Sequence, residues 1–472
     1  MEKAKEIILK KQINKDNIML ILYLLISIIF ATPSAIYLIQ NKTIYRFTNM
    51  FEYTYIIGND VTDFILYIAT FFALFALYFV ILKNCEKIFK SNKKLFLFIL
   101  IVGIIFCIII PVTSLDVYSY IGNGWVDSHF KENPYYTAVG EIINRYGIEE
   151  MIGRVAVCWL EETVVYGPAW SLVCKILTSI SFGNITVALF IFKLAYLLIF
   201  MGCSYLIYKT TKRKIFVAMF ALNPFILFEF LANVHNDIFL MFFVLLAIYF
   251  IKEKKNIALS VASLAIATAM KYLSILLVPF FVIYALKNET MKNKIKKTLI
   301  YAIEFCVIIV AFYLIYVKDI DVLKGIFIQQ NKYGRSIALG LWYLLNGDEK
   351  ILNIIKILEL SAFAICYIAI LAKMFFSKNA KNLTFKRALQ TYQIFILIFT
   401  FILITNFNSW YVIWLFPTLM WQKAKNIRNT LWLSFGAINS YGITYLTKVD
   451  DESVGMIYLI TMALTVAILA LR

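Results

Sequence analysis

Long apolar segments recur along the whole chain, and they constrain its fold more than any other feature. The hydrocarbon core of a bilayer is about 30 Å thick, and about 20 helical residues span it. Hydrophobic residues make up 62% of the chain and charged residues 16%, against about 45–50% and 25% in soluble domains. This composition excludes an ordinary soluble enzyme, a disordered chain and a disulfide-stapled module. We therefore predict an all-α polytopic integral membrane protein with about 14 transmembrane helices.

The segments expected to span are 18–39, 62–82, 95–112, 184–208, 214–230, 237–251, 256–270, 273–286, 298–317, 351–373, 390–405, 410–422, 429–446 and 453–471. Those near 214–286 and 390–422 are short and come in tight pairs. If some of these pairs each form one longer tilted helix, the number of spans falls to about 12 or 13.

The positive charges test this count, since Lys and Arg accumulate in cytoplasmic loops. With the N-terminus inside and strict alternation, 31 of the 46 Lys and Arg residues fall inside, and 20 of the 28 acidic residues fall on or near the outer face. The alternation requires that Ala169–Ser181 does not span, so we expect it to be a helix lying in the outer interface. The net charge of +18 is then mainly an orientation signal, with both termini inside. A nucleic-acid partner is not expected.

Polar residues collect in two outer segments, and these divide the chain. We expect N-terminal transmembrane helices in 1–111, an extracytoplasmic loop with interfacial helices in 112–183, central helices in 184–317, a second outer loop in 318–350 and C-terminal helices in 351–472. Long loops with helical patterns of their own are usually functional. The sequence therefore predicts a reaction chamber at the outer face of the membrane.

Asp116 is the first candidate site residue, in the segment SLDVYSY (114–120) directly after the third predicted span. An aspartate at the mouth of a membrane helix can act as a general base toward a bound hydroxyl. The alternative is a helix start, with Ser114 as N-cap and Asp116 favoured in the first turn by the helix dipole. Spacing alone leaves both interpretations open.

Aromatic residues mark three outer positions: NPYY (133–136), YGPAW (166–170) and NFNSWY (406–411). Pro168 fits the first position of the interfacial helix, and Gly167 fits the turn before it. The rings are expected either to stack on sugar rings or to anchor the chain at the membrane interface. The segment 406–411 lines the chamber or belongs to the interfacial belt.

A dense polar turn, EFLANVHND (229–237), joins two short apolar segments and holds one of the chain's two histidines. His235 is a candidate for hydrogen bonding to a substrate, and His235 with Asp237 and a further acid would make a metal site. The alternative is a polar cap that joins two helices. Lys271, Lys332 and Arg335 are outer cations that could hold a phosphate, and snorkelling to the headgroups is the alternative for Lys271.

The order of these motifs resembles the GT-C superfamily of polytopic glycosyltransferases, which use polyprenyl-phosphate sugars. The resemblance rests on Leu115 to Tyr120, Asn133 to Tyr135 and Tyr166 to Trp170 in the first loop. It continues at Asn223-Pro224, Asn233, His235 to Asp237, Lys271, Pro279, Trp410-Tyr411 and Trp414. Within the superfamily the pattern is similar to the bacterial polyprenyl-phosphomannose-dependent alpha-mannosyltransferases. The lone Asp116, in place of an Asp-Glu pair, and the lack of a soluble C-terminal domain argue against protein as the acceptor.

The resemblance implies a hexosyltransferase of the bacterial cytoplasmic membrane and cell envelope, with its active site on the outer face. Such an enzyme moves a hexose, mannose by default, from a polyprenyl-phosphate donor to a lipid, glycan or cell-wall polymer. Inverting displacement needs one base and cations for the departing phosphate. The residues that the resemblance assigns are Asp116 as base; Lys271, Arg335 and Arg154 for the phosphate; and Tyr118, Tyr120, Asn133, Tyr135, Tyr166, His235, Asn236, Asp237, Trp410 and Tyr411 for the substrates. It implies no resident cofactor and leaves a divalent metal open.

Two other function classes compete with this interpretation. A lipid-linked sugar flippase or other transporter also suits about 14 spans, and its activity would depend on the four charges within them, Lys193, Glu304, Lys356 and Glu359. An O-antigen ligase or polymerase carries its large, Arg-rich outer loop late in the chain, whereas the large loop here is early and holds only Arg145 and Arg154.

Overall fold

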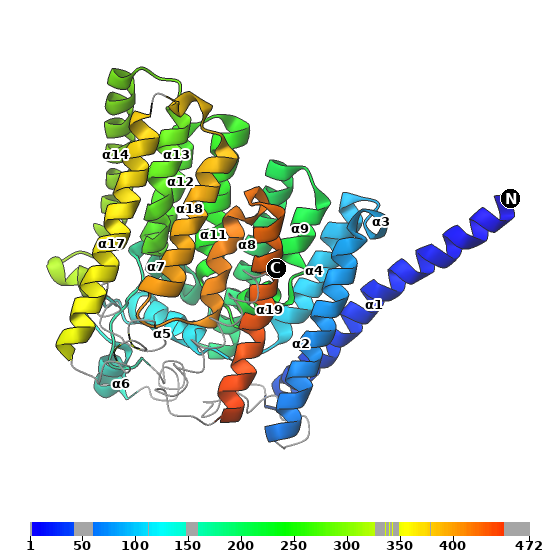
Figure 1. Cartoon of the computed structure of the whole chain (residues 1–472). Helices are drawn as coiled ribbons and strands as arrows, with labels where there is room; N and C mark the ends of the chain where they lie inside the picture. The colour runs from blue at the N-terminus through cyan, green and yellow to red at the C-terminus, as the bar shows by residue number, and fades with distance from the viewer. Residues whose placement is uncertain are drawn as a thin grey trace. The chain divides into compact units, whose positions relative to one another are not determined.

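The computed structural model describes residues 2–41, 60–111, 113–147, 159–325, 349–377 and 379–447, with positions 336, 339 and 342 between them. Every regular element in this part of the chain is helical, and it contains no strand, which confirms the predicted all-α class (Figure 1). The chain divides into two compact units. The first comprises Met1–Glu162 and Val173–Ile238, and the second Thr163–Leu172 and Phe239–Arg472.

The first unit is built around four long helices. Helix α1 (Glu2–Asn41) packs against α2 (Asp60–Lys83) and α4 (Asn92–Ile108), and α4 packs in turn against α8 (Ile185–Thr211). The shorter elements of this unit are α3 (Cys85–Ile88), α5 (Asp116–Ser128), α6 (Val139–Tyr146), α9 (Lys214–Ala221), α10 (Pro224–Leu227) and the π-helix η2 (Phe228–Ala232). Helices α7 (Pro168–Ser179) and α11 (Asp237–Tyr249) have residues in both units.

The second unit packs α12 (Ile257–Met270) against α14 (Met291–Tyr313), and α13 (Val278–Ala285) against α17 (Glu349–Phe376) and α18 (Phe385–Ile398). The 3₁₀-helix η8 (Ser409–Trp421) packs against α18 and against α19 (Ala424–Thr447). The remaining short elements are the π-helices η3 (Phe250–Lys254) and η7 (Phe399–Leu403) and the 3₁₀-helices η4 (Tyr272–Leu277), η5 (Ile320–Leu323) and η6 (Ala380–Asn382).

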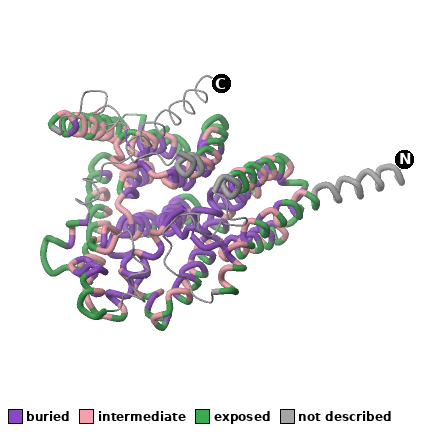
Figure 2. The backbone as a smooth tube through the Cα atoms, turned by 90° about the horizontal axis from the view of Figure 1, so that it is seen from below, coloured by how far each residue is buried: buried purple, intermediate pink, exposed green. Residues whose placement is uncertain are grey.

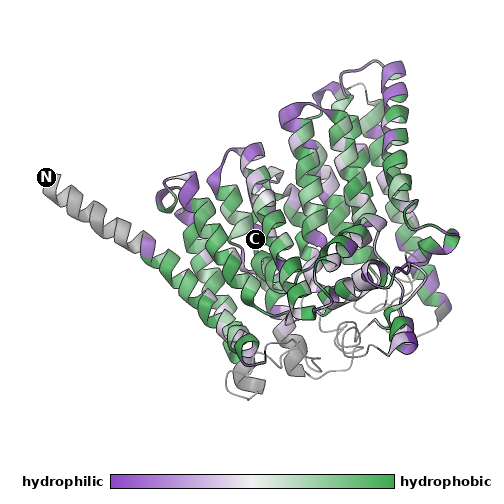
Figure 3. Cartoon of the chain, turned by 180° about the vertical axis from the view of Figure 1, so that it is seen from behind, coloured by the Kyte–Doolittle hydropathy of each residue, from purple (hydrophilic) through white to green (hydrophobic). Residues whose placement is uncertain are grey.

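Several helices carry apolar side chains on their outer faces, as expected of helices that face lipid. Ile303 and Val307 of α14 are 64% and 60% exposed, and Ile357 and Ile365 of α17 are 63% and 68% exposed. Figure 2 shows exposed residues on the outer sides of the helix groups. Figure 3 shows hydrophobic residues along the middle of the helices and hydrophilic residues near their ends.

Four described helices are long and apolar enough to cross a membrane by length and composition, within α1, α2, α8 and α17. A fifth span is counted if Lys214–Ala221 and Pro224–Ala232 form one bent span. The predicted spans from 18–39 to 429–446 each coincide with described helical residues, whereas 453–471 lies outside the described part of the chain. The number of about 14 spans and the orientation of the chain therefore stay predictions.

The predicted span 214–230 is a broken helix in the structure, and the predicted pair 256–270 and 273–286 is interrupted between its two members. At 214–232 the axis bends by 55°, because Pro224 begins a new helix and the Asn223 side chain accepts a hydrogen bond from the Phe225 N–H at 3.0 Å. A proline at the first helical position has no donor to lose. At 256–286 the α-helix stops at Met270 and resumes only at Val278.

The first predicted outer loop, 112–183, holds α5, α6 and α7 among its described residues. The helix expected at Ala169–Ser181 is α7, which begins at Pro168 directly after Gly167, as the sequence predicts. Its position in the membrane interface stays a prediction. Of the second predicted outer loop, 318–350, most of the residues after Gly325 lie outside the described part.

Candidate active site

Asp116 begins helix α5 in the first unit. The Ser114 hydroxyl accepts a hydrogen bond from the Asp116 N–H at 3.2 Å, while Leu115 occupies the cap position. The predicted helix start is therefore correct in kind but displaced by one residue, since Ser114 caps from the position before Leu115. The Asp116 side chain remains 19% exposed, so its carboxylate is still accessible at the start of the helix.

His235 lies just beyond the π-helix η2. Its N–H donates to the Glu229 carbonyl at 3.0 Å, which keeps the chain wound past the end of the helix. The preceding Val234 has a φ of 64°, in the left-handed region. This conformation is strained for a β-branched residue, and such residues persist where their surroundings determine the backbone fully. Val234 and His235 are both completely buried.

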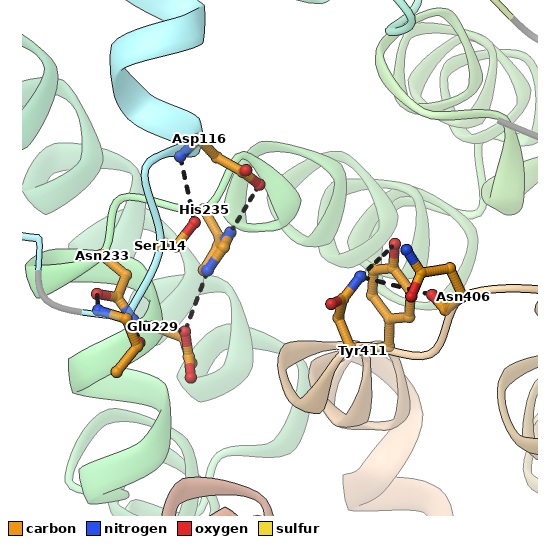
Figure 4. A network of polar contacts seen from close by, with 9 residues as sticks. Ser114, Asp116, Glu229, Asn233, His235, Asn406 and Tyr411 are labelled. Atoms are coloured by element: carbon orange, nitrogen blue, oxygen red, sulfur yellow. Dashed lines mark hydrogen bonds and ion pairs between the residues drawn. The ribbon is translucent and has the colours of Figure 1, made fainter. Parts of the chain in front are cut away.

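Asp116, His235 and Glu229 come together in what we call the acid–histidine cluster (Figure 4). His235 Nδ1 lies 3.5 Å from Asp116 Oδ2, and His235 Nε2 lies 3.2 Å from Glu229 Oε2. The side chains of His235 and Glu229 are fully buried, and Asp116 is the exposed end of the series. Asn233 completes the surroundings, because its Nδ2 donates to Glu229 Oε2 at 3.0 Å and to Thr113 Oγ1 at 2.6 Å.

The two carboxylates determine the charge of the imidazole. Burial alone would lower the pKa of His235, but the contacts of its ring with Asp116 and Glu229, and the charges of these two groups, raise it to about 9. His235 is therefore an imidazolium at neutral pH. A buried charge is tolerated when it is paired, and here the pairing orients the Asp116 carboxylate toward the ring.

The other predicted substrate residues of the first unit are mostly buried. Tyr118, Tyr120 and Tyr135 are 3%, 1% and 4% exposed, so their rings present little surface to a sugar in this conformation. The Asn133 side chain accepts a hydrogen bond from the Tyr135 N–H at 3.1 Å and closes a turn. Asn236 and Asp237 are buried at the start of α11.

In the second unit, Lys271 lies among aromatic side chains. It follows the last residue of α12, and its Nζ lies 5.5 Å from the centre of the Tyr411 ring and 5.2 Å from that of the Trp414 ring. These two rings stack at 4.3 Å. The Lys271 ammonium thus makes cation–π contacts with both rings, and snorkelling to the headgroups stays the alternative prediction. Asn408 Nδ2 lies 3.4 Å from the hydroxyl of Tyr411, which Figure 4 labels. Trp410 packs edge-on against Tyr411.

The YGPAW segment is fixed against the end of α12. The Gly167 N–H donates to the Met270 carbonyl at 3.1 Å. A Cβ on Gly167 would lie 2.1 Å from the Ala269 carbonyl oxygen, so only glycine allows this approach. The partly exposed Tyr166 is thereby held beside the residue that precedes Lys271.

Arg154 and Arg335, predicted to contact phosphate, lie outside the described residues, as does Lys332. In the described part of the chain, no group of three or more His, Cys, Asp or Glu side chains is placed to hold a metal ion, and a metal at His235 and Asp237 stays an untested expectation. From the sequence alone, Glu229 has no predicted role, and Lys193 has one only in a transporter. The sequence signal that could identify Glu229 and Lys193 is an isolated charged residue within an apolar segment.

The comparisons with known proteins point in one direction. Residues 25–287 match a family model described as "Alpha-(1->6)-mannopyranosyltransferase, N-terminal domain". This range contains the acid–histidine cluster and Lys271. Alpha-(1->6)-mannopyranosyltransferase A of Mycobacterium tuberculosis (strain ATCC 25618 / H37Rv) is 26% identical over 181 residues, which cover 37% of this chain and 33% of that protein. The chain thus matches about a third of the relative's length. No solved structure matches it.

The raised pKa of His235 predicts a pH-dependent stability. A group whose pKa is higher in the folded chain stabilises it fully below the unfolded pKa of about 6.5 and loses that contribution as the pH rises through the folded value. We expect the unfolding free energy to fall by about 3 kcal/mol between about pH 6.5 and pH 9.5. The measurement is thermal melting of the detergent-purified protein across this range. His235→Gln should flatten the profile and His129→Gln should not; equal slopes in all three proteins would contradict the assignment.

The close approach of Gly167 to α12 predicts a steric effect. Gly167→Ala must displace the Ala269 backbone, and overpacking of this kind costs about 1–3 kcal/mol, so the melting temperature should fall. Gly436→Ala is the matched control, because nothing lies within 4 Å of a Cβ at this helical glycine. Its melting temperature should stay the same or rise, since alanine favours a helix over glycine by about 1 kcal/mol. A Gly167→Ala protein as stable as the control would refute the packing.

Proposed function

The chain belongs to the alpha-(1->6)-mannopyranosyltransferase family, and from that membership we propose that it is a membrane glycosyltransferase that transfers mannose. The proposed donor is a polyprenyl-phosphate mannose, and the proposed acceptor is a hydroxyl of a lipid, glycan or cell-wall polymer. The distribution of Lys and Arg supports a site on the extracytoplasmic side of the membrane. The apolar surfaces of the helices suit a donor whose carrier is a lipid.

The observation that carries the proposal is the exposed end of the acid–histidine cluster. The Asp116 carboxylate is partly exposed to solvent, and the buried imidazolium of His235 lies 3.5 Å from it. In the proposed reaction, Asp116 accepts the proton of the acceptor hydroxyl while the acceptor oxygen attacks the anomeric carbon. The bond between that carbon and the phosphate oxygen breaks on the opposite face, which inverts the configuration. The imidazolium of His235 keeps the carboxylate oriented for this step.

The departing phosphate needs a positive charge. Lys271 supplies an ammonium that lies over the Tyr411 and Trp414 rings. A cation fixed in this way pays less conformational entropy when it binds an anion. We propose that it forms a charge-assisted hydrogen bond with the phosphate of the donor. Arg335 and Arg154 stay proposals for the same role.

The flippase alternative depends on charges within the spans. Lys193, the most buried of the four at 1% exposed, has its ammonium surrounded by backbone carbonyls. Such a group supports the fold and is poorly placed to bind a passing substrate. This favours the transferase over the transporter.

Asp116→Asn should abolish the proposed transfer while leaving the fold intact. Loss of a general base costs about 10²- to 10⁴-fold in rate, and the amide keeps the shape of the side chain. The assay follows mannose transfer from a panel of polyprenyl-phosphate sugars by purified protein in detergent. Asp127→Asn is the matched control, because Asp127 lies on the same helix and pairs with Lys175 at 2.7 Å. Full activity of Asp116→Asn would refute the assignment of the base.

Lys271→Met should weaken the binding of the donor. Methionine keeps the apolar stem over the two rings but removes the charge, and a hydrogen bond to a charged group is worth about 10- to 100-fold in affinity. We expect the KM for the donor to rise by about that factor. Lys287→Met is the control, since Lys287 also lies over a tyrosine ring, 4.9 Å from the centre of Tyr284. An unchanged KM for Lys271→Met would exclude Lys271 from the phosphate site.

A further inference from the structure

Lys193 binds three backbone carbonyls in the interior of the first unit. Its Nζ donates to the carbonyl of Ile109 at 2.7 Å, of Leu231 at 2.8 Å and of Ala232 at 2.9 Å. These are as many partners as an ammonium has hydrogens. The residue is 1% exposed, so its charge is compensated by these carbonyl dipoles.

The three carbonyls belong to the two segments that carry the acid–histidine cluster. Ile109 is the C-cap residue directly after α4, and the chain continues from it to Thr113 and Asp116. Leu231 and Ala232 are the last residues of η2, four and three positions before His235, respectively. A helix end presents carbonyl groups that attract a cation, and Lys193 meets two such ends at once.

A second link joins the same two segments nearer the cluster. Asn233 Nδ2 donates to the Thr113 hydroxyl at 2.6 Å, and the Thr113 N–H donates to Asn233 Oδ1 at 3.3 Å. Lys193 and this pair of hydrogen bonds therefore fix one segment against the other at two successive positions. Beyond them lie Asp116 on one segment and His235 on the other.

We propose that Lys193 is a positioning residue that sets the distance between Asp116 and His235. It does so by binding the end of α4 and the end of η2, from which the two segments continue to these residues. The inference rests on the proposed function for its catalytic consequence, but not for its structural one. A shift of about 1 Å in a reacting group costs about 100-fold in rate. Lys193 lies too deep in the unit to touch a substrate, so any effect on transfer acts through the pair.

The decisive test is the titration of His235, which needs no substrate. The chain has two histidines, so histidine-labelled protein in detergent gives two NMR titration curves, with His129 as the internal reference. In the natural protein the pKa of His235 should be about 9. In Lys193→Met it should fall toward about 6.5, because the ring moves away from its carboxylates. Loss of a nearby positive charge alone would raise this pKa, so a fall reports the changed distance.

Two variants complete the titration. Lys94→Met is the matched control: Lys94 Nζ donates to the carbonyl of Ile88, the last residue of α3, at 2.9 Å, and its loss should leave the His235 curve unchanged. Lys193→Gln keeps two N–H donors, and it serves where Lys193→Met fails to fold; its curve should fall by less. A folded Lys193→Met or Lys193→Gln protein in which His235 still titrates near 9 would overturn the proposal.

Transfer measurements separate positioning from a general loss of structure. Lys193→Met should lower kcat about 100-fold, with little change in the KM for the donor. In the Asp116→Asn background the same substitution should add almost nothing, because the pair it positions is already inactive. Additive losses in the double variant would refute the positioning role. If the natural protein transfers no sugar, the proposed function fails, while the titration of His235 still decides the role of Lys193.

Discussion

The hydrogen bonds from the Lys193 ammonium to three buried carbonyls join the two segments that carry Asp116 and His235, and the proposed geometry of the acid–histidine cluster depends on them. In a membrane-embedded fold, no bulk water satisfies the carbonyls that a broken helix leaves open. A lysine satisfies three of them at once and adds favourable charge at two helix ends. The site can therefore be built from interrupted helices, which bring side chains to positions that a continuous helix could not.

The backbone around His235 is costly, and its cost has a structural purpose. A π-helix followed by a left-handed valine carries about 1–3 kcal/mol of strain. In return, the His235 N–H reaches the Glu229 carbonyl while its ring reaches the Glu229 side chain. Glu229 thus fixes both the backbone and the imidazole of His235. Within the acid–histidine cluster, His235 and Glu229 are buried and the Asp116 side chain is partly exposed.

The sequence predicts the fold and the outer end of the site, but not its interior. The lengths and positions of the apolar segments locate the long described helices, and Gly167-Pro168 locates the start of α7. Asp116 and His235 are both candidates from their surroundings in the sequence, yet their contact joins positions 119 residues apart. Glu229 is missed because its relation to His235 depends on a π-helix, whose register no regular periodicity gives. Lys271 is found, but the two rings beneath it lie about 140 residues later in the chain.

Lys193 and Lys271 show that the contacts of a charged side chain indicate whether it stabilises the fold or is available to bind a ligand. An ionisable residue within a membrane segment is a functional candidate by default. Lys193 donates to three backbone carbonyls. The Lys271 ammonium lies over the faces of two rings, which attract its charge. Ring contacts stabilise an ammonium by about 0.5–2 kcal/mol, less than a charge-assisted hydrogen bond to a phosphate provides. The partners of each lysine therefore separate a charge that holds the fold from one that can bind an anion.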